Sequence, residues 1–222
     1  MPTPGRRALP PAAPAAGAVS VNALLLHGAT KPLVFAAALL PLALLIWGAA
    51  ADTLGANPAE ALIRSAGDWT LRFLCLTLAV TPLRQWTGWH ALARLRRMLG
   101  LFTFFYGVVH FLCFAWLDMG FEIDAIVLDI GKRPFILVGT AALLSMLPLA
   151  ATSFNRAIRA LGAKRWQALH RAVYGTALLA LLHFFWMRAG KNDFAEVAVY
   201  AAVIALLLGW RLWRRIGTRV SA

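Results

Sequence analysis

Three histidines lie inside strongly apolar stretches of the sequence, at His110, His170 and His183. An ionisable side chain within a membrane-spanning helix is costly, so it usually faces the interior of the helix bundle and a partner there. A neutral imidazole is also a common axial ligand of haem iron. We therefore interpret the three histidines as candidate haem ligands. The alternative is that each one only hydrogen-bonds a carbonyl group on a neighbouring helix.

His110 and His183 form the strongest candidate pair. His110 lies 12 residues into an apolar stretch that begins at Met98, and His183 lies 17 residues into one that begins at Trp166. These stretches are the third and fifth of six predicted spans, so they run in the same direction and both histidines fall in the outer half of the membrane. The pattern predicts one haem iron held between the two imidazoles.

His170 lies nearer the cytoplasmic side, where a second haem would need a counterpart on the third span. Arg96 precedes His110 by 14 residues, which in a helix is ~1400° of rotation and a rise of ~21 Å. His170 and His183 are 13 residues apart, so a straight helix would place them ~140° apart around its axis. The second site therefore needs a helix distortion. Arginine is also not an ordinary iron ligand, because its guanidinium keeps its proton.

The elements that would position these residues are membrane-spanning helices. The chain has 222 residues, is 61% hydrophobic, and repeats apolar runs that can each cross a hydrocarbon core of ~30 Å. We predict an all-α fold, a polytopic membrane protein with a six-helix transmembrane bundle. The expected spans are Leu33–Ala51, Trp69–Leu83, Met98–Leu117, Pro134–Ala151, Trp166–Met187 and Phe194–Trp213, the second beginning earlier, within 58–65.

The basic residues indicate the orientation of the bundle. With a cytoplasmic N-terminus, the inner segments hold fifteen basic residues and the outer segments five, as the positive-inside rule requires. Both termini are therefore predicted to be cytoplasmic. Orientation also explains the net charge of +13, so we expect no nucleic-acid partner. We expect a disordered cytoplasmic tail at 1–30, a haem-binding transmembrane domain at 31–215 and a cytoplasmic tail at 216–222.

Haem propionates are anionic, and arginine or lysine side chains near the ends of the spans are candidate partners for them. On the inner side the candidates are Arg97, Lys164, Arg165 and Arg171, and on the outer side Arg72 or Arg188. For any one of these residues, snorkelling to the membrane interface is the simpler explanation.

Several stretches of the sequence together resemble a known family. They are RRMLGLFTFFYGVVHFLCFAWLDMG at 96–120, KRPF before the fourth span and LGAKRWQALHRAVYGTALLALLHFFWM at 161–187, with LGANPAEAL and LAVTPLR around the second span. They resemble the MsrQ (YedZ) family, haem-binding membrane subunits of bacterial methionine-sulfoxide reductase systems. The likeness covers about 50–215. The wider relatives are the ferric reductase-like transmembrane domains, which include the membrane domains of the NADPH oxidases.

The resemblance implies a b-type cytochrome with six helices in the bacterial inner membrane. Such a subunit takes electrons from the quinone pool or a cytoplasmic flavin donor and passes them to a periplasmic molybdopterin reductase of the MsrP type, which repairs oxidised methionines in proteins. It implies one haem b or two, and FMN. His110 and His183 match the haem-ligand histidines of the family and His170 the third such histidine, whereas Arg96 stands where the oxidase relatives have a fourth histidine.

The sequence leaves two other functions open. A ferric reductase-type system would need flavin and nucleotide domains, and the sequence has no glycine-rich phosphate loop, so another subunit would have to supply them. A non-redox transporter or assembly factor would bind no haem. One stretch also departs from the family: AGDWTL at 66–71 replaces a TGRTAL-like stretch, which puts any flavin or quinone site there in doubt.

Overall fold

The computed structural model describes residues 20–190 and 192–220, and within these residues the chain is helical throughout and contains no strand. The elements are α1 (Val21–Leu26), α2 (Thr30–Ala50), α3 (Pro58–Thr87), the 3-10 helix η1 (His90–Leu92), α4 (Ala93–Cys113), the π-helix η2 (Phe114–Asp118), α5 (Ile123–Lys132), α6 (Pro134–Ala151), α7 (Asn155–His170), α8 (Val173–Ala189) and α9 (Ala195–Val220).

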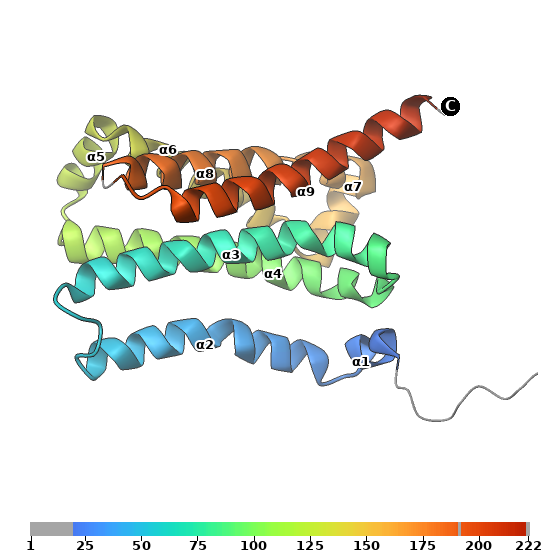
Figure 1. Ribbon diagram of the computed structural model, residues 1–222, viewed down its shortest axis with the longest axis horizontal. Coiled ribbons are helices and arrows are strands. Elements are labelled where there is room, and N and C mark those ends of the chain that lie inside the picture. Colours follow the sequence, from blue (N-terminus) through green and yellow to red (C-terminus); the bar gives the residue numbers. More distant parts are fainter. Residues whose placement is uncertain (1–19, 191, 221–222) are drawn as a thin grey trace, which may run out of the picture.

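The long helices lie side by side in one bundle (Figure 1), in which α3 packs on α4, α6 on α8, and α9 on both α3 and α8. Short α5 lies at one end of this bundle and α7 at the other, and we call these the α5 end and the α7 end. Many large apolar side chains on the outside are exposed, as expected where a helix faces lipid. The prediction of an all-α polytopic bundle is confirmed.

Five stretches of the described chain are long and apolar enough to cross a membrane: Thr30–Ala50, His90–Asp118, Pro134–Ala151, Asn155–Ala189 and Ala195–Gly217. The sixth long helix is α3, whose 30 residues rise ~45 Å. It begins at Pro58, as expected, because Asn57 caps it by accepting a hydrogen bond from the Glu60 amide at 3.1 Å. Its charged residues lie on either side of 73–83, and most of its buried residues lie within this stretch.

The predicted fifth span, Trp166–Met187, contains a short turn. α7 ends at His170 and α8 begins at Val173, so a turn separates the two histidines of this stretch. Arg171 and Ala172 in this turn keep right-handed helical φ and ψ values, so Asn155–Ala189 still forms one candidate span. The turn contains Arg171 but neither proline nor glycine, the usual signals of a helix end.

The ends of the chain differ from simple tails where they are described. Residues 1–19 of the tail expected at 1–30 lie outside the described residues, and the remainder contains α1. At the other end α9 continues to Val220, beyond the expected domain boundary at 215.

Candidate functional site

A cavity of about 510 Å³ lies among α3, α4, α6 and α8 towards the α5 end of the bundle. This volume is within the usual range of ~300–1,000 Å³ for small-molecule and cofactor sites. Its walls are mostly apolar side chains, including Leu71, Phe111, Ile136 and Leu143. His110 and His183, the pair expected from the sequence, both line it.

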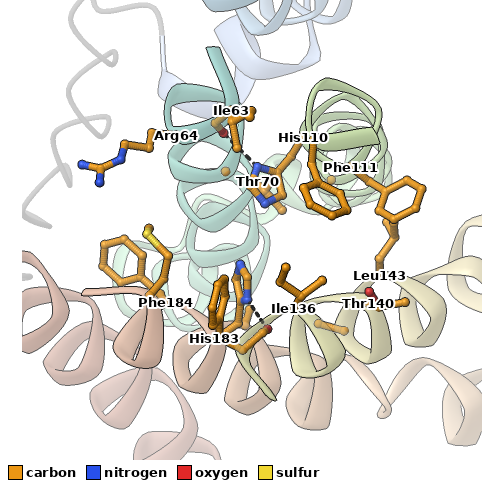
Figure 2. Close-up of a pocket in the computed structure, with 18 of the residues that line it drawn as sticks. Ile63, Arg64, Thr70, His110, Phe111, Ile136, Thr140, Leu143, His183 and Phe184 are labelled. Atoms are coloured by element: carbon orange, nitrogen blue, oxygen red, sulfur yellow. Dashed lines mark hydrogen bonds between the residues drawn. The ribbon is translucent and has the colours of Figure 1, made fainter. Parts of the chain in front are cut away.

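The two imidazoles face each other across this cavity (Figure 2), His110 from α4 and His183 from α8. Their ring centroids are 6.0 Å apart and their planes are inclined by 71°. Two imidazoles bound on opposite sides of one metal through bonds of ~2 Å would have centroids roughly 6 Å apart. The observed separation therefore fits a single metal ion between the rings.

A backbone carbonyl holds one nitrogen of each imidazole. The Nδ1 of His110 lies 2.8 Å from the Ile63 oxygen, and the Nδ1 of His183 lies 2.6 Å from the Phe135 oxygen. A carbonyl oxygen can only accept, so Nδ1 carries the hydrogen in both rings. In a neutral imidazole this leaves the lone pair on Nε2, and Figure 2 shows the second nitrogen of each ring directed towards the other ring. The same second-shell hydrogen bond orients most metal-bound histidines.

Two imidazoles alone suit a metal ion whose other ligands come from a macrocycle. Among the described residues no group of three or more His, Cys, Asp or Glu side chains is placed to hold a metal ion. A bare ion bound by protein usually takes at least three side-chain ligands, whereas haem iron needs only axial ones. Two facing imidazoles in an apolar cavity therefore fit haem.

The arginines that line this cavity differ from those expected, and three carboxylates line it as well, from Glu60, Asp68 and Asp118. Arg64 and Arg133 line it, whereas Arg72 and Arg188 do not. Arg72 lies over the Trp69 ring, with its guanidinium carbon 4.7 Å from the ring centroid. Arg188 forms salt bridges with Asp193 and Glu196, which tie the end of α8 to the start of α9.

Arg64 and Arg133 were missed because a local partner already explains each of them. Arg64 forms a salt bridge with Glu60, and Arg133 with Asp129, both at a spacing of four residues. Such pairs are ordinary on helix surfaces and do not mark a site. Arg64 and Arg133 are far apart in the sequence, so only the folded structure shows that both residues line one cavity.

A second cavity, of about 460 Å³, lies towards the α7 end and brings together His170 and Arg96. Its charged lining is wholly basic, with Arg97, Arg171 and Arg215 beside Arg96 and no carboxylate. Of the four inner candidates, Arg97 and Arg171 line it, and Lys164 and Arg165 do not. The cavity therefore suits an anionic group.

His170 is held differently from the other two histidines. Its Nε2 lies 3.1 Å from the Thr152 hydroxyl oxygen, and its ring stacks on Trp166 with centroids 3.9 Å apart. Nε2 thus already has a polar partner, and no second imidazole lines this cavity. The second cavity fits a ligated haem less well than the first does.

The chain also matches a known family. A family model described as ferric reductase like transmembrane component matches residues 66–181, a range that contains His110 and His170 and ends two residues before His183. No solved structure gives a significant match.

Curated relatives match nearly the whole chain. A protein of Polaromonas naphthalenivorans is 66% identical over 85% of this chain and 86% of its own length. One from Bordetella pertussis is 57% identical, over 86% and 93%. One from Xanthomonas campestris pv. campestris is 47% identical, over 86% and 89%. Each of the three is named protein-methionine-sulfoxide reductase heme-binding subunit MsrQ.

Proposed function

Because this chain belongs to the MsrQ family, within the ferric reductase like transmembrane components, we propose that it is the haem-binding electron-transfer subunit of a methionine-sulfoxide reductase. His110 and His183 would hold the iron of a haem b in the first cavity. The observation that carries this proposal is the pair of facing imidazoles, each with Nδ1 fixed by a carbonyl and Nε2 left free.

When bound, haem supplies one-electron redox chemistry, and the protein contributes position and electrostatics. The apolar walls of the first cavity exclude water around the group. Arg64 and Arg133, which line the cavity together with Glu60, Asp68 and Asp118, would be the candidate cationic partners of the propionates. The carbonyl groups of Ile63 and Phe135 keep the proton of each ligand on Nδ1.

In the second cavity we propose an anionic cofactor beside His170, either a second haem b or FMN. Arg96 is a partner for an anionic group there and not an iron ligand, since guanidinium has no free lone pair. Binding at His170 requires its imidazole to exchange the Thr152 hydroxyl for the metal or to present its other nitrogen. The wholly basic lining supports an anionic occupant, and FMN is the other anionic cofactor that the family implies.

The direction of electron flow follows from the orientation predicted by the positive-inside rule. The α7 end then faces the cytoplasm together with both termini, and the α5 end faces the periplasm of a bacterial inner membrane. Electrons enter from the quinone pool or a flavin donor at the His170 side. They leave near His183 to a periplasmic molybdopterin reductase of the MsrP type, which repairs oxidised methionines.

Two measurements on the purified protein test the proposal. They are absorption spectra of the oxidised and the dithionite-reduced protein, and the amount of haem per chain. We expect a Soret shift on reduction, and loss of the first haem in His110→Ala and His183→Ala. The matched control is His90→Ala, because His90 lies in η1 and lines neither cavity. Absence of a Soret shift in the unsubstituted protein contradicts the cytochrome function, and an unchanged haem content in His183→Ala contradicts the ligand assignment.

A further inference from the structure

The two carbonyl groups that hold the histidines share one local pattern. Ile63 lies four residues before Gly67 in α3, and Phe135 lies four residues before Gly139 in α6. In an α-helix the carbonyl of residue i accepts from the amide of residue i+4. The carbonyl that each imidazole contacts is therefore the one that accepts the amide hydrogen of the glycine in the helix. The imidazole lies on the side of the helix where that glycine carries no side chain.

The space beside each glycine is filled by the imidazole itself. A Cβ atom at position 139 would lie 2.7 Å from Nδ1 and 2.8 Å from Cε1 of His183. A Cβ atom at position 67 would lie 3.1 Å from the same two atoms of His110. Non-bonded heavy atoms prefer separations of ~3.5–4.0 Å. A methyl group at 139 would therefore displace the His183 ring, and one at 67 would press on the His110 ring.

Backbone conformation does not explain these two glycines. The glycines with positive φ in the described chain are Gly55, Gly88, Gly120 and Gly162. Gly67 and Gly139 instead lie inside regular helices, where glycine is a weaker helix former than alanine. The close approach of the imidazole is what requires glycine there.

We propose that Gly67 and Gly139 are positioning residues for haem ligation. Each opens a slot beside a helix carbonyl, in which the imidazole of the packed neighbouring helix lies with Nδ1 bonded to that carbonyl and Nε2 towards the cavity. The device occurs twice, once where α3 packs on α4 and once where α6 packs on α8. This inference rests on the proposed function, since it assigns the slots a role only if His110 and His183 bind haem.

Closing a slot weakens the Nδ1–H hydrogen bond, which normally raises the basicity of a metal-bound imidazole. A less basic ligand stabilises ferric iron less, so the reduction potential rises. Loss of such a second-shell partner typically costs ~10–100-fold in metal affinity. The effect is larger at Gly139, where the added carbon meets the imidazole more closely.

The experiment compares Gly139→Ala and Gly67→Ala with Gly175→Ala in the full chain. Gly175 lies in α8, the helix of His183, and an added Cβ there meets nothing within 4 Å. Haem affinity, midpoint potential and the ferric electron paramagnetic resonance spectrum are measured for each. We expect a ~10–100-fold loss of affinity and a higher potential for Gly139→Ala. Smaller changes of the same sign are expected for Gly67→Ala, and none for Gly175→Ala.

A merely structural role for these glycines would lower thermal stability but leave the potential and spectrum of the bound haem unchanged. Wild-type affinity, potential and spectrum in both Gly67→Ala and Gly139→Ala overturn the inference. If Gly139→Ala does not fold, Gly67→Ala decides alone, because its contacts require only a small displacement. A wild-type protein without haem, or a silent His183→Ala, contradicts the proposed function instead.

Discussion

At the scale of single residues, the structure combines two uses of histidine that the sequence poses as alternatives. A buried imidazole either bonds a neighbouring carbonyl or binds a metal, and His110 and His183 each have one nitrogen for each purpose. The carbonyl bond fixes the tautomer and so prepares the other nitrogen for iron. His170 differs, because its Nε2 meets a hydroxyl group that can donate or accept.

The difference between these histidines predicts separate effects of their removal. If the second cavity holds haem, His170→Ala is expected to lower the haem content by one per chain. The spectrum of the first haem is expected to stay unchanged, because His170 and His183 lie on opposite sides of the turn between α7 and α8. Pyridine haemochrome quantification and low-temperature spectra measure both quantities. A purified protein with a single haem, retained in His170→Ala, removes the second site.

At the scale of elements, composition predicts which helices exist better than where they end. Apolar runs indicate the spans, but α3 carries charges that shorten its apparent span to half of the helix. The turn after His170 contains neither proline nor glycine, the usual signals of a helix end. The slots beside the helix carbonyls also cannot be predicted from the sequence. Gly67 and His110 are far apart in the sequence, and only the packing of α3 on α4 brings them together.

The kink within α7 does have a sequence signal, which is Gly162. Gly162 has φ 72° and ψ 153°, where the helix is kinked, and a Cβ there would meet no atom within 4 Å. This conformation is nearly exclusive to glycine, and another residue there costs on the order of 1–3 kcal/mol. The kink sets the direction of the half of α7 that carries Trp166 and His170.

Gly162→Ala is therefore expected to destabilise the protein by about 1–3 kcal/mol and to weaken ligand binding in the second cavity. Haem in the first cavity stays bound, since its ligands come from α4 and α8. Gly131→Ala in α5 is the control, because its added carbon also meets open space but its φ is not positive. Thermal unfolding in detergent and haem quantification check both effects. Equal stability of the two variants contradicts the role of the kink.

At the scale of the whole molecule, the two cavities lie in series along the bundle. Met146 of α6 lines both of them, so one partly shared wall separates the candidate sites. The first cavity has carboxylates and arginines in its lining, and the second has only basic charged groups. This asymmetry matches a membrane protein whose basic end lies in the cytoplasm, where positive residues are retained during insertion.

The orientation makes a prediction that does not depend on haem. Ala56 lies exposed between α2 and α3 at the α5 end, and Ala160 lies exposed in α7 at the other end. The native Cys75 and Cys113 are first replaced by alanine, and Ala56→Cys or Ala160→Cys is then introduced singly. A membrane-impermeant maleimide should label position 56 in intact cells whose outer membrane is permeabilised. It should label position 160 only after the inner membrane is opened, because the positive-inside rule places the arginine-rich α7 end in the cytoplasm. The reverse labelling order would show that the bundle has the opposite orientation in the membrane. The reductase partner would then have to contact the His183 end from the cytoplasmic side.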